Sequence, residues 1–258
     1  TQALWMRIRS YQSKSKYRLL GWLGAIPQRP TSGARLGHTR PPGRTAVVRR
    51  SKGDCVQSAS GEWFDEAYYQ RFYFDKKTSV IDPEHARRLG AFVCSYLAYL
   101  RVPVHRVLDV GCGIGLWRDA VQQHFPGAVY QGVEFSSYLC ERYGWQQGSV
   151  VDWRPADGQP FDLVICQGVL PYLSPADLKK ALANLGRLTR GGLYIEAVAK
   201  EDYERDIIDE DLTDPRLYRH RAELYRRGLQ PFCKELGGGV WLSRQAELPL
   251  FELECLGG

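Results

Sequence analysis

The 258-residue sequence lacks the signatures of several protein classes. Its longest apolar runs, such as "LVIC" before Gln167, have the length of a strand, well short of the ~20 apolar residues that span a membrane. Its seven cysteines are scattered and include no C-x-x-C pair, which argues against a disulfide framework and against a zinc site. The sequence therefore predicts a soluble, cytoplasmic protein with no membrane span and no metal.

Acidic residues are almost absent from the first 60 positions. Residues 1–60 carry 12 lysines and arginines and one acid, a net charge of +11, whereas residues 61–258 carry 23 and 28, a net charge of −5. The first segment is rich in Arg, Pro, Gly and Ser, so its composition predicts a basic, disordered arm. The acidic balance of the body argues against a nucleic acid partner.

Three other interpretations of the arm stay open. Its Arg- and Ser-rich, acid-poor composition is typical of an organelle transit peptide, which residues 1–50 could form. A basic arm could also contact nucleic acid or anionic lipid. Finally, part of the segment could precede the natural start, because the chain opens with Thr and its one methionine is at position 6.

Short apolar runs alternate with helical patterns along most of the body. The spacing predicts helices over residues 62–74 and 82–102, then strands at 105–112, 128–135, 148–153, 161–169 and 193–199 with helices between them. Ser174 and Pro175 are expected to begin the last of these helices, and Gly191-Gly192 to end it in a left-handed turn. One more helix is expected over 214–228, and strands at 237–244 and 248–256.

This order of elements predicts an α/β fold. Strands that alternate with helices of about ten residues form a parallel sheet covered by helices on both faces. The last two predicted strands are joined by a short loop, so they are expected to finish the sheet as an antiparallel hairpin.

Three glycines follow the first predicted strand in "VLDVGCGIG", Val107 to Gly115. The first strand-to-helix turn of such a sheet contacts the ligand, and glycine lets bare backbone approach it. A phosphate loop would need a lysine that is absent, and in a dinucleotide motif the last glycine would fall on Leu116. Asp109 would repel a pyrophosphate, so the pattern indicates a cation or a hydroxyl at this turn.

Two further acids end predicted strands. Glu134 stands 19 residues after Gly115, the position from which a carboxylate binds both ribose hydroxyls. Asp152, in "VVDW", could accept from an exocyclic amine. An amine, a ribose and an adenine in that order describe S-adenosylmethionine.

With these motifs the chain resembles the class I S-adenosylmethionine-dependent methyltransferases, over about residues 80–258. The similar segments are "VLDVGCGIG", "GVEFS", "GSVVDW", "FDLVICQGVLPYL" and "LTRGGLYIEA". The resemblance implies a Rossmann-like, seven-stranded, mostly parallel sheet with an antiparallel last strand. It also implies a cofactor site formed by Asp109, Gly111, Cys112, Gly113, Gly115, Glu134, Phe135, Asp152, Trp153 and Gln167.

The resemblance also implies a role for each part of that site. Asp109 and the glycine turn would shape the methionine end, and Glu134 would bind the ribose. Phe135 would lie against the adenine and Asp152 would meet its amino group, with Trp153 beside it, while Gln167 would line the floor near the sulfonium. Residues 61–258 would form the methyltransferase domain, with 61–100 as a helical lid and 101–258 as the cofactor-binding sheet.

Missing motifs narrow the expected acceptor to a small organic molecule. The fourth strand lacks the [ND]-P-P-[YF] sequence of amide and base N-methyltransferases, and neither paired cysteines nor a metal-binding acid cluster is present. Tyr68, Tyr69 and Phe72 could form an aromatic wall for the acceptor, or simply pack the helix on the sheet. Candidates for a general base are Tyr172, Glu196 and His220, each of which could equally have a structural role.

Two rival functions remain. An RNA or protein methyltransferase could use residues 1–60 to capture its substrate. The chain could also be a non-catalytic subunit that binds S-adenosylmethionine.

Overall fold

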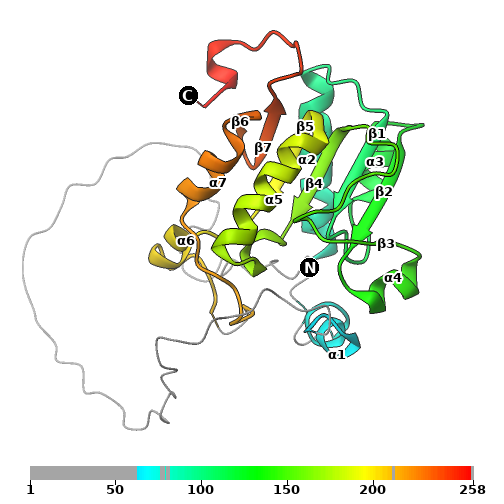
Figure 1. The fold of residues 1–258 in the computed structure, drawn as a ribbon, viewed down its shortest axis with the longest axis vertical. Coiled ribbons are helices and arrows are strands. Elements are labelled where there is room, and N and C mark those ends of the chain that lie inside the picture. The colour runs from blue at the N-terminus through cyan, green and yellow to red at the C-terminus, as the bar shows by residue number, and fades with distance from the viewer. Residues whose placement is uncertain (1–62, 76–78, 80–81, 211–212, 257–258) are drawn as a thin grey trace, which may run out of the picture. The chain divides into compact units, whose positions relative to one another are not determined.

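Seven strands among the described residues form one sheet in the order β3-β2-β1-β4-β5-β7-β6 (Figure 1). The computed structural model describes residues 63–75, 79, 82–210 and 213–256; the predicted basic arm, residues 1–60, lies outside the described residues. The strands are β1 Arg106–Val110, β2 Val129–Glu134, β3 Gln146–Gln147, β4 Phe161–Gln167, β5 Thr189–Glu196, β6 Cys233–Gly237 and β7 Val240–Ser243.

The sheet is parallel from β3 to β5, and β7 runs antiparallel to both β5 and β6. This arrangement confirms the predicted fold class, a mostly parallel Rossmann-like sheet that ends in an antiparallel pair. The chain moves outward from β1 through β2 to β3 and then returns to place β4 on the other side of β1. The strand order therefore reverses between β1 and β4, where open α/β sheets bind their ligands.

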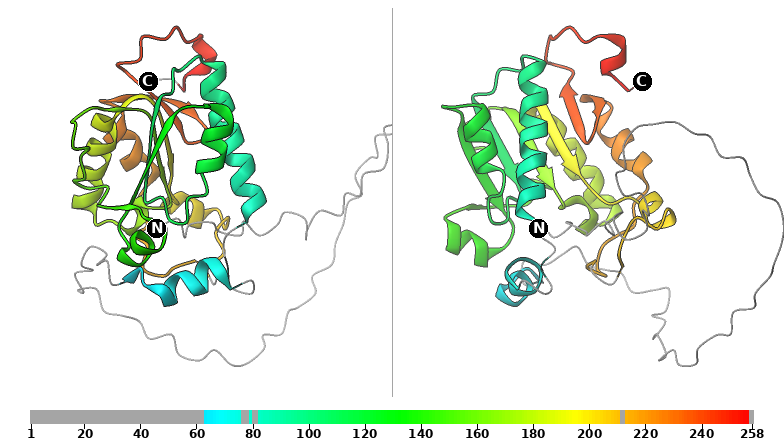
Figure 2. Two further views of the ribbon diagram at one scale, coloured as in Figure 1. Left: turned by 90° about the vertical axis from the view of Figure 1, so that its right-hand side faces the viewer. Right: turned by 180° about the vertical axis from the view of Figure 1, so that it is seen from behind.

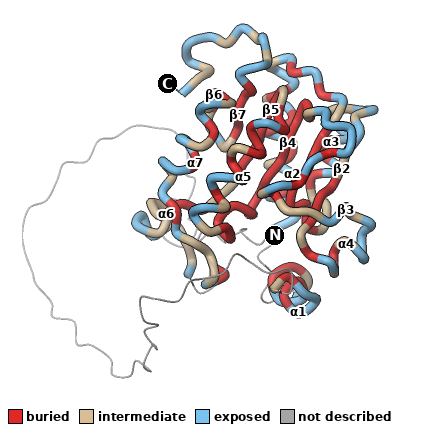
Figure 3. Tube along the Cα trace, viewed as in Figure 1, coloured by how far each residue is buried: buried red, intermediate tan, exposed pale blue. Residues whose placement is uncertain are grey.

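Helices cover both faces of this sheet (Figure 2). One face packs against α2 Pro83–Tyr99 and α3 Arg118–His124, and the other against α5 Pro175–Leu188 and α7 Ala222–Leu229. The strands between these two layers are buried along most of their length (Figure 3). The shorter helices α4 Ser137–Tyr143 and α6 Lys200–Glu204 follow β2 and β5. In the described part of the chain, no helix has both the length and the apolarity to cross a membrane.

The sequence signal at the start of α5 is confirmed, and the structure shows a similar cap at the start of α2. The Ser174 hydroxyl accepts from the backbone N–H of Asp177, and Pro175 is the first residue of α5. Asp82 accepts from the N–H groups of Glu84 and His85 at the start of α2. Local capping chemistry was therefore sufficient to place these boundaries.

The aromatic segment upstream of α2 is helical, as predicted, but short and irregular. It consists of α1 Glu66–Tyr69 and a π-helical turn, η3 Gln70–Phe74. Its rings pack on one another and on Leu139 of α4 rather than on the sheet. This segment lies at the end of the domain where β1, β2 and β4 finish (Figure 1).

The prediction of a strand over 148–153 was wrong. The strand β3 ends at Gln147, and the backbone then turns, with the N–H groups of Asp152 and Trp153 both donating to the carbonyl of Ser149. These local hydrogen bonds replace pairing with β2. Asp152 thus lies in a turn after β3 and not at the end of a strand.

The prediction that Gly191-Gly192 ends a helix in a left-handed turn was also wrong. The helix α5 ends at Leu188, and Thr189 already has the extended backbone of β5. Both glycines lie inside β5, at positions where a side chain would not fit. A Cβ on Gly191 would meet the carbonyl oxygen of Asp162, and a Cβ on Gly192 would approach Leu97 Cδ2 to 2.7 Å.

We expect Gly191→Ala to lower the free energy of unfolding by about 3 kcal/mol, because the obstacle is backbone of the neighbouring strand and cannot rotate away. Urea denaturation measures the change. Gly127→Ala is the control: its φ is +92° but a Cβ there meets nothing within 4 Å, so only backbone strain of about 1 kcal/mol is expected. An equal loss in both variants would contradict the steric explanation.

The antiparallel pair lies one element earlier than predicted. Its strands are β6 and β7, joined at Gly238 and Gly239, whereas residues 248–256 hold only a 3₁₀ turn, η5 Glu252–Glu254. The prediction of a strand over 248–256 was therefore wrong. Leu248, Leu250 and Cys255 pack on the core without strand pairing, whereas Leu253 is 98% exposed.

The prediction of one helix over 214–228 was only partly correct. The helix α7 begins at Ala222, and residues 213–221 form a turn followed by an irregular stretch. The backbone of this segment bonds elsewhere: Tyr218 N–H donates to the carbonyl of Pro171, and the carbonyl of His220 accepts from Lys200. Tertiary hydrogen bonds have thus replaced the helical ones.

Candidate functional site

A cavity of about 320 Å³ opens at the carboxyl ends of β1, β2 and β4, next to the point where the strand order reverses. Its size is at the lower end of the range for small-molecule sites. Its walls are formed by Phe64, Val110, Gly111, Phe135, Gly148, Ser149, Val150, Val151, Asp152, Val169, Tyr172, Leu173, Asp177 and Lys180. Three of the predicted cofactor residues, Gly111, Phe135 and Asp152, are therefore in the wall.

The three glycines of the turn after β1 all need the conformational freedom of glycine. Gly111, Gly113 and Gly115 have φ values of +71°, +54° and +80°. The neighbour that crowds Gly115 is part of the protein: a Cβ there would lie 2.9 Å from Trp145 Cζ2. The Trp145 indole N–H also donates to the carbonyl of Gly113 at 2.9 Å. Trp145 thus fixes the outer side of the turn, and Gly111 faces the cavity.

Asp109 is a fully buried carboxyl one residue before the cavity wall. Its Oδ2 accepts from the Tyr130 hydroxyl at 2.5 Å, and its Oδ1 has no hydrogen-bond partner within the described residues. Burial raises the pKa of this carboxyl to about 7, although the hydrogen bond from Tyr130 opposes the rise. A buried acceptor without a donor is costly, so Asp109 is suited to receive a donor from a ligand.

Glu134 is also fully buried, and its carboxylate organises the backbone around the turn. Its Oε1 accepts from the N–H groups of Phe135 and Ser136, and its Oε2 accepts from Gly113 N–H at 2.8 Å. The carboxylate therefore holds the glycine turn and the residues after β2 together. The structure places Glu134 behind the cavity wall, and its contact with a ribose stays a prediction.

The predicted adenine contacts separate into two groups. Phe135 and Asp152 line the cavity, and Asp152 is exposed at its rim. Trp153 instead turns into the core, where its ring lies 6.2 Å from that of Phe161. Gly148 makes room for that indole, because a Cβ on it would meet Trp153. Cys112 is buried behind the glycine turn, and burial raises the pKa of its thiol.

Gln167 belongs to a polar network between the sheet and α3. Its Oε1 accepts from the Trp117 indole at 2.7 Å, and its amide donates to Glu196 at 3.0 Å. The Tyr194 hydroxyl donates to the same Glu196 oxygen, and burial raises the pKa of Glu196 to about 7. Neither Gln167 nor Glu196 lines the cavity. As a residue Glu196 is partly exposed, but its carboxyl is enclosed by these partners.

Tyr172 is the candidate base that does line the cavity. Its hydroxyl lies 3.2 Å from Asp214 Oδ2 and 3.0 Å from the Tyr68 hydroxyl. Because a carboxylate only accepts, Tyr172 donates to Asp214 and receives from Tyr68. Burial raises the pKa of Tyr172 well above its usual value, so the hydroxyl is held in its neutral form.

Asp214 and Arg216 tie the cavity wall to the aromatic segment. The Arg216 guanidinium binds both carboxylate oxygens of Asp214, with a shortest distance of 2.7 Å. It also lies over the rings of Trp63, Phe64 and Tyr68, 5.4 to 5.9 Å from their centres. Three segments far apart in sequence therefore meet at one ion pair beside the cavity.

The predicted aromatic wall lies mostly behind the cavity. Tyr68, Tyr69 and Phe72 are buried in one cluster, where the ring of Tyr68 packs on the other two at 5.1 and 4.9 Å. The aromatic side chain of this segment that reaches the cavity is Phe64. His220, the third candidate base, is buried and donates from Nε2 to the carbonyl of Leu173 at 2.9 Å. Burial lowers the pKa of His220.

Sequence reasoning missed Phe64, Asp214 and Arg216. Phe64 stands in the aromatic segment, and the helical spacing gave no reason to prefer it to its neighbours. Asp214 is one of several acids between residues 201 and 214, and no local pattern separates a buried acid from a solvated one. Its partner Tyr172 is 42 residues away, so the pairing depends on the tertiary fold.

Several known proteins are similar to this chain over the region that contains the cavity. The family model described as "Methyltransferase domain" matches residues 108–194. Ubiquinone biosynthesis O-methyltransferase from one Coxiella burnetii strain is 25% identical over 141 residues, which cover 46% of this chain and 58% of that protein. In another strain the identity is 30% over 96 residues, 33% of this chain and 39% of that protein. The matched regions span about half the length of these curated relatives.

A similar solved structure is magnesium protoporphyrin IX methyltransferase from Synechocystis PCC 6803 with bound S-adenosylhomocysteine. It is 19% identical, with a TM-score of 0.49 over 70% of this chain and 95% of that one. The family match confirms the resemblance to the class I methyltransferases that the sequence motifs indicated. It includes β1, the glycine turn, β2 and β4, and so contains most of the cavity wall.

Proposed function

We propose that this chain is an S-adenosylmethionine-dependent methyltransferase that acts on a small organic acceptor. The observation that carries the proposal is the combination at the carboxyl end of β1: a glycine turn beside a 320 Å³ cavity, and a buried carboxylate oxygen that no described group satisfies. Such an oxygen favours a cationic or hydrogen-bond-donating ligand. The cavity also lies at the reversal of strand order.

The residues present suit this cofactor. Asp109 would hold the ammonium of the methionine end beside Gly111, and Phe135 and Val169 offer apolar walls for an adenine. Asp152, at the rim, would accept from the adenine amino group. Glu134, whose carboxylate holds the backbone of the turn, would bind the ribose hydroxyls. The bound cofactor supplies an electrophilic methyl group, so the protein contributes mainly placement.

Phe64 and Tyr172 are the residues we assign to the acceptor side. Phe64 offers an apolar face. Tyr172 uses its hydroxyl proton in the hydrogen bond to Asp214, so towards a ligand its oxygen can only accept. This polarity suits an acceptor that carries an O–H or N–H group. Residues 61–100 would act as the lid of the domain, with the ion pair Asp214–Arg216 holding α1 over the cavity.

The cytoplasm is the compartment we propose. Free thiols support it, since all six cysteines in the described part of the chain are unpaired. The rival that uses residues 1–60 to capture RNA or protein gains no support from the cavity, whose walls are mostly apolar.

Transfer of a labelled methyl group tests the proposal. The full chain is incubated with methyl-labelled S-adenosylmethionine and the small-metabolite, RNA and protein fractions of a cell extract. Label is expected in the small-metabolite fraction. Label in RNA or protein, lost when residues 1–60 are deleted, would favour the first rival. Tight binding of S-adenosylhomocysteine with no transfer to any fraction would favour the non-catalytic subunit.

A further inference from the structure

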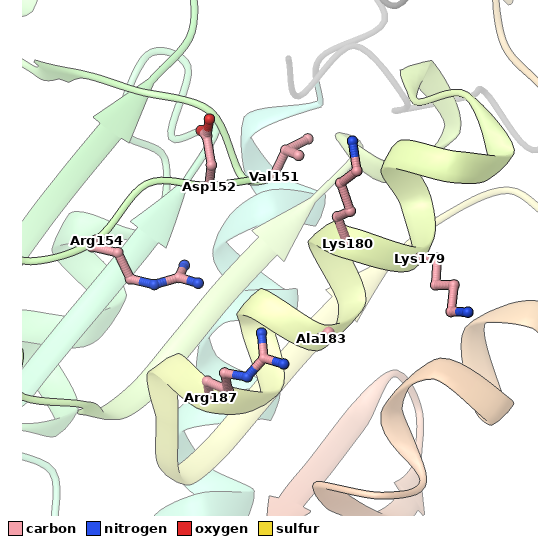
Figure 4. Close-up of a pocket in the computed structure, with 7 residues that line it drawn as sticks. All are labelled: Val151, Asp152, Arg154, Lys179, Lys180, Ala183 and Arg187. Carbon is pink, nitrogen blue, oxygen red and sulfur yellow. The ribbon is translucent and has the colours of Figure 1, made fainter.

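A second hollow of about 560 Å³ lies beside the first, between the turn after β3 and the outer surface of α5 (Figure 4). Its walls are Val151, Asp152, Arg154, Lys179, Lys180, Ala183 and Arg187. Val151, Asp152 and Lys180 also line the smaller cavity, so the two are neighbours. The small side chain of Ala183 leaves the groove open between the longer side chains of α5.

Two guanidinium groups from different elements converge in this groove. Arg154 extends from the turn towards α5, and Arg187 extends from the last turn of α5 into the same space (Figure 4). Lys180 stands on α5 opposite Asp152, at the end nearest the smaller cavity, and Lys179 points away from the turn. Like charges repel, so two arginines that face one open space favour an anion between them.

The charge of these arginines is not neutralised by the protein. In the described residues neither Arg154 nor Arg187 has a carboxylate partner: Arg154 donates to the carbonyl of Trp153, and Arg187 lies 5.9 Å from the Phe232 ring. Most other arginines on this surface are paired, for example Arg106 with Asp157 and Arg226 with Glu235. This groove therefore holds two arginines without carboxylate partners on a body whose net charge is −5.

The arrangement suits an anion with more than one charge. Each guanidinium presents a planar pair of donors that matches a phosphate or a carboxylate. Lys180 is already paired with Asp177 at 3.0 Å, so the two guanidinium groups are the donors left for such an anion. The floor contributes the apolar side chains of Val151 and Ala183, which focus the field of the surrounding cations.

We propose that this groove binds a small ligand with two or more phosphate groups, held by Arg154 and Arg187. The groove contains neither Phe64 nor Tyr172, the residues assigned to the acceptor side, so this ligand is distinct from the methyl acceptor. Asp152 excludes anions from the adenine end of the smaller cavity, which places the phosphates towards Arg154 and Arg187.

Calorimetric titration of the full chain with sodium tripolyphosphate tests the proposal. We expect saturable binding that weakens as NaCl is raised, and a loss of at least 30-fold in affinity in the Arg154→Ala/Arg187→Ala double variant. The Arg101→Ala/Arg205→Ala double variant removes the same two charges from exposed sites elsewhere and is expected to bind like the wild type. Thermal unfolding of all three proteins checks that each is folded.

Three results would overturn the proposal. The first is no binding of tripolyphosphate by the wild type at millimolar concentration. The second is equal affinity in Arg154→Ala/Arg187→Ala and in Arg101→Ala/Arg205→Ala. The third concerns RNA: if a single-stranded RNA binds tightly, competes with tripolyphosphate and ignores the double substitution, the phosphate site lies on another part of the chain.

Discussion

The affinity for S-adenosylhomocysteine is expected to rise about tenfold per pH unit between pH 5 and pH 6 and to become constant above pH 8. The reason is that burial raises the pKa of Asp109 to about 7, so that only about 1% of the free protein carries the carboxylate at pH 5. A ligand ammonium binds the charged form. The apparent dissociation constant increases in inverse proportion to the fraction of protein that is competent to bind.

Asp109→Asn is expected to remove this pH dependence and to weaken binding at pH 8 by at least 50-fold. Isothermal titration from pH 5 to pH 8.5 measures both effects. The control is Glu196→Gln: burial also raises the pKa of Glu196 to about 7, but its carboxyl is bound by Gln167 and Tyr194 away from the glycine turn. This variant should keep the wild-type profile. If the pH dependence survives in Asp109→Asn, or disappears in Glu196→Gln, a group other than Asp109 controls the binding.

Asp214→Ala is expected to lower the free energy of unfolding by about 3 kcal/mol. The Asp214 side chain is 2% exposed and the Arg216 side chain 33%, so removal of the carboxylate leaves a largely enclosed cation without its partner. The Tyr172 hydroxyl loses its acceptor at the same time. Because the pair joins residues 213–221 to α1, hydrogen exchange of both segments should also become faster.

Urea denaturation measures this change, with Glu223→Ala as the control. The pair between Glu223 and Arg227 has a similar distance, 2.7 Å, but its side chains are 56% and 74% exposed. Exposed pairs contribute less than about 1 kcal/mol, so this variant should unfold almost like the wild type. If both variants lose the same stability, or if exchange in α1 is unchanged, Asp214 does not hold the lid.

Local chemistry predicted most of the sheet. The alternation of apolar runs with helical patterns gave β1, β2, β4 and β5 in parallel order, and the turn after β1 gave the position of the cavity. Both features are determined by local sequence. For example, Gly111, Gly113 and Gly115 are needed in the turn because their φ values are positive. Ser174 likewise caps α5 with its own side chain.

The errors came from contacts between distant residues. Gly191-Gly192 looked like the end of a helix, but these glycines are required by Asp162 and Leu97, which belong to other elements. Residues 148–153 looked like a strand because they are apolar, yet Trp153 and Val150 are buried in a turn that packs on α5. The resemblance placed Trp153 beside Asp152 at the adenine, whereas the structure has its ring in the core.

The sequence predicted the position of the candidate site but not all of the residues that line it. A residue type can indicate a ligand, as Asp109 does, but only the fold decides which aromatic ring reaches the cavity. Phe64 does so and Tyr68 does not, although both belong to one short segment. The two hydrogen bonds that link Tyr68, Tyr172 and Asp214 have no local sequence signature, because these residues come from three separate parts of the chain.

A crystal structure of the full chain with S-adenosylhomocysteine tests the central claim most directly. The expected result is the nucleoside in the 320 Å³ cavity, its base between Phe135 and Val169 near Asp152, and its ammonium on the free oxygen of Asp109. S-adenosylhomocysteine bound outside this cavity, or bound in it while Asp109 still has no donor, would contradict the proposed function. NAD or ATP bound at the glycine turn would contradict it as well.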